Sequence, residues 1–168
     1  MSPSLLALSY FIHLVATVVW IGGLVILTVL VIPEARRALA ENAALLTLMT
    51  RLRKRFTPLS NLSLALLIAT GMFQMAGDPN YQGVLQFNNQ WSIAILLKHI
   101  AVIGMVAVGL ILQLVTIPAL ERATFMLERG KGNPDDHERL RRQEVRLTWI
   151  NLLLGIAVLG FTAWATAL

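Results

Sequence analysis

Four apolar stretches, each long enough to cross a lipid bilayer, constrain this 168-residue chain more than any other feature. They lie at about residues 4–33, 56–77, 91–118 and 147–167. About 20 apolar residues in a helix span the hydrocarbon core, and backbone groups without partners cannot persist there, so each stretch must be helical. The sequence therefore predicts an all-α integral membrane protein with a single transmembrane domain, residues 1–168.

The basic residues gather in two of the connections between these stretches. Of 14 Lys and Arg, six lie in residues 36–55 and seven in residues 122–146, whereas residues 78–90 contain none. Because cytoplasmic loops carry an excess of Lys and Arg, we expect both basic connections to be cytoplasmic. Both termini and the 78–90 loop are then external. The net charge of +5 needs no nucleic-acid partner, and the expected surroundings are the lipid bilayer of a prokaryotic inner (plasma) membrane.

The two halves of the chain resemble each other. The first apolar stretch contains His13 and ends at Pro33, and the third contains His99 and ends at Pro118, so the interval from histidine to proline is nearly the same in both. In both halves a basic cluster then precedes the next apolar stretch. This pattern predicts a four-helix bundle made of two tandem helix hairpins, about residues 4–77 and 91–167. A pseudo-two-fold axis along the membrane normal would relate the two hairpins.

The two histidines lie at nearly the same depth in helices of the same direction. His13 is nine residues into its stretch and His99 is eight into its own, a difference of about 1.5 Å along a helix. Ionisable residues inside membrane helices are costly and usually face a partner, and two imidazoles on opposing helices can hold a haem iron. The leading hypothesis is a b-type cytochrome that binds haem b between His13 and His99 and transfers electrons at the outer side of the membrane. The alternative for each histidine is a hydrogen bond to a neighbouring helix.

Five further residues are candidates for the same site. Thr17 and Trp20 follow the first histidine at helical spacing and are expected on its face, where plain helix packing is the alternative. Lys98 is expected to pair with a haem propionate or else to extend towards the outer interface. Met72 and Met75 could form a copper site with the histidines, or could simply fill space between helices.

No catalytic arrangement is evident. The chain has no cysteine, which excludes disulfides and thiolate metal sites. Every carboxylate except Asp78 belongs to a cytoplasmic segment, away from both histidines. The pattern favours an electron carrier over an enzyme, and it leaves the redox partner, a quinone site and homo-oligomerisation open.

The stretch HLVATVVWIGG, from His13 to Gly23, resembles the opening helix of the CopD-type copper-resistance membrane domain. That helix has a histidine, then a tryptophan, then paired glycines. Short matches to the second and third spans of the family are Arg55-Phe56, Ser60, Thr70-Gly71 and Leu97-Lys98. This resemblance implies copper binding or transport.

The same first helix and the intramembrane Lys98 are also similar to the HemJ family of membrane protoporphyrinogen oxidases, which bind haem b. That resemblance implies a haem-dependent oxidoreductase with His13 as the haem ligand and Lys98 as a functional residue. His99 has no counterpart in either pattern.

Overall fold

The computed structural model describes residues 2–39, 43–81, 83 and 89–168; part of the predicted outer loop, residues 82 and 84–88, lies outside the described residues. Within the described residues, four helices are long and apolar enough to cross a membrane: Pro3–Leu39, Thr47–Gly77, Gln90–Glu128 and Pro134–Thr166. The all-α class and the two tandem hairpins are thus confirmed, as expected for a membrane four-helix bundle. The helices extend beyond the predicted spans because the basic connections are themselves largely helical.

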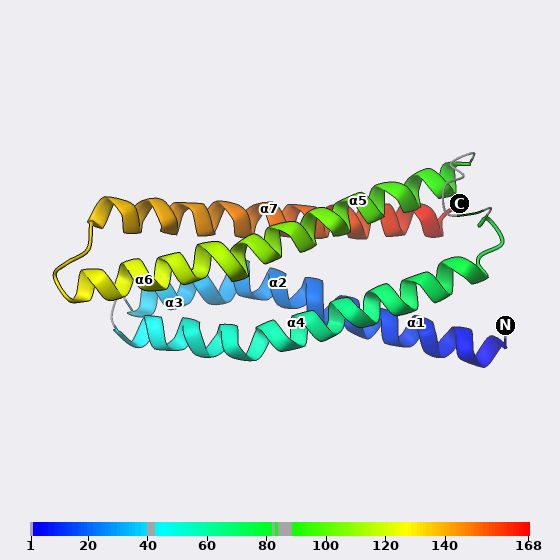
Figure 1. Ribbon diagram of the computed structural model, residues 1–168. Helices are drawn as coiled ribbons and strands as arrows, with labels where there is room; N and C mark the ends of the chain where they lie inside the picture. Colours follow the sequence, from blue (N-terminus) through cyan, green and yellow to red (C-terminus); the bar gives the residue numbers. More distant parts are fainter. Residues whose placement is uncertain (1, 40–42, 82, 84–88) are drawn as a thin grey trace. The chain divides into compact units, whose positions relative to one another are not determined.

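The first hairpin comprises one long interrupted helix and one continuous helix. The long helix contains α1 (Pro3–Thr17), α2 (Gly23–Ile26) and α3 (Ile32–Leu39), joined by two short π-helical turns, and the continuous helix is α4 (Ala43–Gly77). Both α1 and α3 contact α4 along an antiparallel pairing that is visible in Figure 1. The N-terminal end of α1 therefore lies beside the C-terminal end of α4.

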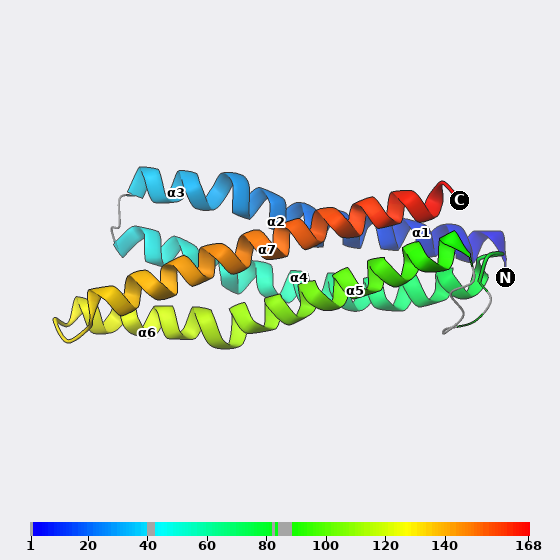
Figure 2. The same cartoon turned by 90° about the horizontal axis from the view of Figure 1, so that it is seen from above.

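The second hairpin has the same design. Its first helix contains α5 (Gln90–Ile111) and α6 (Ile117–Glu128), and it pairs with the continuous helix α7 (Pro134–Thr166), as Figure 2 shows. Asn89 begins α5 with a reciprocal capping box, in which its side chain accepts from the Ser92 N–H and the Ser92 hydroxyl accepts from the Asn89 N–H. Asn133 begins α7, where its side chain accepts from the Asp135 N–H.

The side chains follow the pattern of a membrane protein. Several of the largest apolar side chains are exposed, among them Phe11, Val18 and Leu114. Small polar residues, by contrast, are buried between helices: Ser9, Thr28, Ser60, Ser63, Thr70, Ser92 and Thr116. Apolar surface faces outward at little cost only where lipid replaces water, and small residues let membrane helices approach each other. The chain is therefore a multi-pass membrane protein.

Each interrupted helix contains a π turn immediately before an Ile-Pro pair. The π turn Leu27–Val31 precedes Ile32-Pro33, and the π turn Leu112–Thr116 precedes Ile117-Pro118. Proline has no N–H to continue the α-helical ladder, and π turns are one way in which membrane helices accommodate it. Aligning Pro33 with Pro118 therefore gives a structural register between the two hairpins.

Close packing in the first hairpin depends on one of its paired glycines. A Cβ atom added at Gly23 would lie 2.8 Å from Phe56 Cζ on α4, whereas one added at Gly22 would lie 4.0 Å from Val18 Cγ1. Real Cβ atoms do not approach other atoms as closely as the first distance. Gly23 is therefore the glycine against which the Phe56 ring packs.

This difference predicts unequal effects for two otherwise identical substitutions. Gly23→Ala should lower the free energy of unfolding by roughly 1–3 kcal/mol relative to Gly22→Ala, the usual cost of overpacking. Both variants gain the same helix propensity, so the comparison isolates the contact with Phe56. Thermal unfolding in detergent, followed by circular dichroism, measures the difference, and equal midpoints for the two variants would contradict the packing.

Candidate functional site

A histidine within the first membrane span, His13 on α1, is hydrogen-bonded to the neighbouring helix α4. Its Nδ1 atom lies 2.8 Å from Oγ1 of Thr70 on α4. The Thr70 hydroxyl donates to the Leu66 carbonyl at 2.6 Å. Since a hydroxyl has a single hydrogen, its oxygen must accept from a protonated Nδ1 of His13. This contact fixes the tautomer, so Nε2 is the unprotonated ring nitrogen, the form in which an imidazole nitrogen binds a metal.

The imidazole lies against the backbone of α4 at a glycine. A Cβ atom added at Gly71 would lie 3.5 Å from Cε1 of His13, at van der Waals contact. The ring edge that carries Cε1 and Nε2 therefore passes close to Gly71, while Nδ1 is held by Thr70 one residue earlier. A larger side chain at position 71 would press on the ring edge that carries the reactive nitrogen.

A second set of hydrogen bonds joins α1 to α4 one turn closer to the C-terminal end of α4. Gln74 donates through Nε2 to the Ser9 carbonyl at 3.1 Å and to Ser9 Oγ at 3.3 Å. Ser9 Oγ in turn donates to the Thr70 carbonyl at 3.5 Å. These bonds fix the register of the two helices beside His13 and so fix the position of the imidazole relative to α4.

Ser9, Thr70 and Gln74 were not among the residues predicted for the site. The signal that could have found them is the four-residue spacing of polar residues in otherwise apolar helices: Ser9, His13 and Thr17 on one helix, and Thr70 and Gln74 on the other. Residues four apart share a helix face, so each series predicts a polar strip facing another helix.

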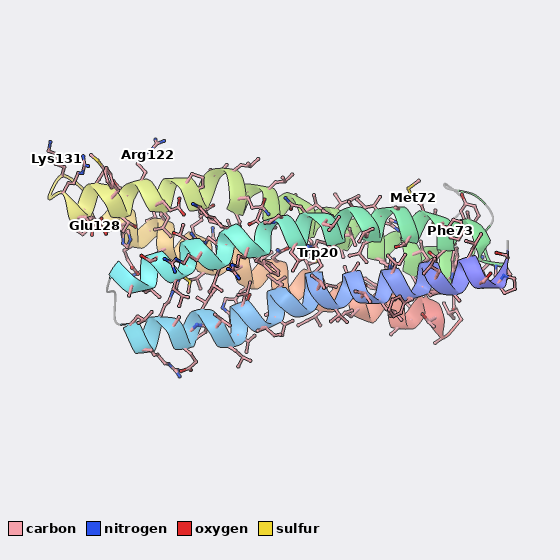
Figure 3. The ribbon with its side chains drawn as sticks, turned by 90° about the horizontal axis from the view of Figure 1, so that it is seen from below. Trp20, Met72, Phe73, Arg122, Glu128 and Lys131 are labelled. Carbon is pink, nitrogen blue, oxygen red and sulfur yellow. The ribbon has the colours of Figure 1, made fainter. Side chains whose placement is uncertain are left out.

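Thr17 and Trp20 occupy different environments. The Thr17 hydroxyl donates to the backbone carbonyl of His13 at 2.8 Å, so it supports the helix at that residue. Trp20 lies in the π turn Val18–Gly22 and is buried; it is labelled in Figure 3. Their predicted role in binding a cofactor remains a prediction.

The two methionines near the C-terminal end of α4 differ in exposure. Met72 is 64% exposed and points away from α1 (Figure 3). Met75 is half-buried and follows Gly71 by four residues, which places it on the same face and about 6 Å further along the helix. Of the two, Met75 is on the face of α4 that His13 contacts.

In the second hairpin, His99 is exposed on α5 and its Nδ1 lies 2.7 Å from the Ile95 carbonyl. A carbonyl only accepts, so Nδ1 of His99 also carries the proton and Nε2 is again the acceptor nitrogen. The two histidines therefore share a tautomer. They differ in direction, because His13 faces the partner helix of its own hairpin, whereas His99 is on an exposed side of its helix.

The register of the π turns explains this difference. Aligning Pro33 with Pro118 relates His13 to Lys98 rather than to His99. One residue changes the depth in a membrane by only about 1.5 Å, but it turns the side chain by about 100° around the helix axis. Lys98 is half-buried, and its ammonium forms no ion pair with any residue that the structure describes. Its pairing with a haem propionate stays a prediction.

The described part of the chain contains no group of three or more His, Cys, Asp or Glu side chains that could hold a metal ion. A metal at His13 would therefore have to be held with other donor types. The thioether sulfur of methionine is the available one in these apolar helices, and it suits a soft ion such as Cu(I).

A family model described as copper resistance protein D matches residues 50–165, which is more than two thirds of the chain. The match includes α5, Thr70, Met75, Lys98 and His99, and it begins after His13. No curated protein and no solved structure matches the chain. The match agrees with the copper-related alternative of the sequence analysis, and it gives no support to haem b, cytochrome function or electron transfer.

Proposed function

Because the chain belongs to the copper resistance protein D family, we propose that it binds copper ions inside the membrane and takes part in their movement across it. The observation that carries this proposal is the hydrogen bond from Nδ1 of His13 to Thr70 Oγ1. Metal-binding histidines usually donate their second ring N–H to a fixed acceptor, which orients the ring and raises the basicity of the ligand nitrogen. The Nδ1–H of His13 makes such a hydrogen bond with Thr70.

The donor set around His13 favours Cu(I). Nε2 of His13 supplies an imidazole nitrogen, and Met75 is the candidate for a thioether ligand. Both ligands are neutral, so a bound Cu(I) ion would carry a single positive charge. Charge inside a membrane span is costly, and a monocation costs less to hold there than a dication. Copper is the cargo in this proposal, and His13 with Met75 would be one stop on its route.

The shared tautomer of His13 and His99 favours one alternative. A haem iron held by two histidines needs an unprotonated nitrogen from each, and Nε2 has that form in both residues. The two ligands would come from different hairpins, and their pairing on one iron stays a prediction. Haem-dependent porphyrinogen oxidation by the same chain is the enzymatic version of this alternative.

One experiment separates copper from haem. The purified protein is offered Cu(I) under reducing conditions in competition with the chromogenic chelator bicinchoninate, and a second sample is offered haem. We expect the chain to remove copper from the chelator while the haem sample shows no change in the Soret band beyond that of haem in detergent alone. A sharp Soret band with split low-spin bands on reduction, together with no copper uptake, would replace the copper proposal with the haem alternative.

The membrane orientation gives a separate prediction. From the distribution of Lys and Arg, residues 78–81 should be external and residues 129–133 cytoplasmic. Asn80 and Lys131 are exposed at opposite ends of the spans, and Figure 3 shows Lys131 and Arg122 pointing away from the helices. A cysteine at Asn80 should react with a membrane-impermeant thiol reagent on intact cells, and a cysteine at Lys131 should react only after the cells are opened. The reverse pattern would invert the topology.

A further inference from the structure

The π turn Leu27–Val31 of the first hairpin deprives one backbone carbonyl of its usual helical donor. Ile32 donates its N–H to Leu27, one residue further back than in an α-helix. In an α-helix the Thr28 carbonyl would accept from the N–H of Ile32. In a π turn it would accept from the next residue, which is Pro33. Proline has no N–H. The Thr28 carbonyl therefore has neither its α-helical donor, the N–H of Ile32, nor a π-helical donor at position 33.

The second hairpin repeats this arrangement in the same register. Ile117 donates its N–H to Leu112, and the following residue is Pro118. The carbonyl that loses both its α-helical and its π-helical donor is that of Gln113. When Pro33 is aligned with Pro118, Thr28 aligns with Gln113, so two helices with different side chains expose a carbonyl at equivalent positions. The cause is the shared Ile-Pro pair.

Each of these carbonyls has a buried hydroxyl nearby in the chain. Thr28 and Thr116 are 5% and 1% exposed, and neither Oγ1 atom has a hydrogen-bond partner among the described residues. This is unusual for the protein. The hydroxyls of other threonines in its helices donate to the carbonyl four residues earlier, namely those of Thr17, Thr70, Thr124, Thr148, Thr162 and Thr166.

Unsatisfied polar groups inside a membrane cost several kcal/mol each, so a carbonyl and a hydroxyl should not both remain bare. A threonine hydroxyl in a helix can reach a carbonyl three or four residues earlier, and Thr116 follows Gln113 by three residues. In the first hairpin both groups belong to Thr28. A hydroxyl can donate and accept, while a carbonyl accepts, so one small molecule that does both can satisfy the pair.

We propose that each π turn, Leu27–Val31 and Leu112–Thr116, binds an ordered water molecule through the unpaired carbonyl and the buried threonine hydroxyl. Water is the ligand because the site offers only a carbonyl oxygen and a hydroxyl, both uncharged and both able to hydrogen-bond to water. Copper prefers softer nitrogen and sulfur ligands. The site is also distinct from the candidate copper site, since Thr28 lies about 22 Å along the helix from His13. A water inserted into the helical ladder would make each π turn a local joint in its helix.

Water-edited solid-state NMR of the labelled protein in lipid vesicles tests this directly. Magnetisation from water should reach the carbonyl carbons of Thr28 and Gln113 early. The carbonyls of Leu27 and Leu112 are the matched controls, because they lie one residue away at the same depth and accept a hydrogen bond. Transfer to Thr28 and Gln113 that is no faster than transfer to these controls would overturn the proposal.

A proline substitution in one hairpin gives a second test, with the other hairpin as its control. Pro33→Ala restores an N–H that can reach the Thr28 carbonyl, so early transfer to Thr28 should disappear while transfer to Gln113 is kept. Thr28→Val should reduce the same signal by removing the hydroxyl. Unchanged early transfer to Thr28 in the Pro33→Ala protein would refute the role of the missing N–H. Copper binding is measured on the same samples and should be unaffected, so this result is independent of the proposed function.

Discussion

Replacing His13 by alanine should abolish copper binding in the chelator competition. The substitution removes the imidazole ligand of the proposed site, and the side chains hydrogen-bonded at or beside His13 offer hydroxyls and an amide instead. Loss of the partner of a metal ligand alone typically weakens binding by about 10- to 100-fold. Loss of the ligand itself should exceed that range.

Matched variants make this result specific. Met75→Leu should weaken copper binding because it removes the proposed thioether ligand. Met72→Leu should leave copper binding unaltered because Met72 is exposed and points away from α1. His137 lies near the start of α7 beside Asp135 and Asp136 and is not part of the proposed site, so His137→Ala controls for the removal of an imidazole. Copper binding that survives His13→Ala at full strength would place the site elsewhere and remove the basis of the proposed function.

His99→Ala distinguishes a copper site in one hairpin from a site that uses both histidines. If copper is held by His13 and Met75, this variant should bind copper as the unmodified chain does. If the paired-histidine alternative is correct, His13→Ala and His99→Ala should have equal effects and should each convert a low-spin haem spectrum to a high-spin one. Unequal effects on haem would exclude the symmetric pair.

Thr70→Val should weaken copper binding by roughly 10- to 100-fold although every proposed ligand is still present. Valine has nearly the volume of threonine but cannot accept the proton of Nδ1. His13 would then lose the contact that fixes its tautomer and its orientation against α4. The measurement is the same chelator competition, carried out at one pH for all variants.

Thr70→Ser is the matched control because serine keeps the hydroxyl. It should bind copper within a few-fold of the unmodified chain. The comparison separates the hydrogen bond from packing, since both substitutions leave a small side chain at a buried position. Equal affinities for the valine and serine variants would show that the contact with Thr70 has no part in metal binding, even if His13 itself were a ligand.

Much of the architecture follows from the sequence alone. Four apolar stretches with two basic connections leave four membrane helices in two hairpins as the solution, because a bilayer admits only helices or closed barrels. His13 is equally evident, since a histidine inside an apolar span is costly unless it has a partner. The Ile-Pro pairs at 32–33 and 117–118 also mark where each helix must depart from α geometry.

The tertiary structure decided which side chains these residues meet. Sequence spacing gives depth along a helix well, but a shift of one residue rotates a side chain by about 100°. Two histidines of nearly equal depth can therefore face in different directions, as His13 and His99 do relative to their own hairpins. Met72 is likewise turned by about 100° from Gly71, its neighbour in the chain, whereas Met75 follows Gly71 by four residues and shares its face. Only the packing of α1 on α4 identifies Thr70 as the partner of His13, because that contact joins residues far apart in the chain and depends on the register of two helices.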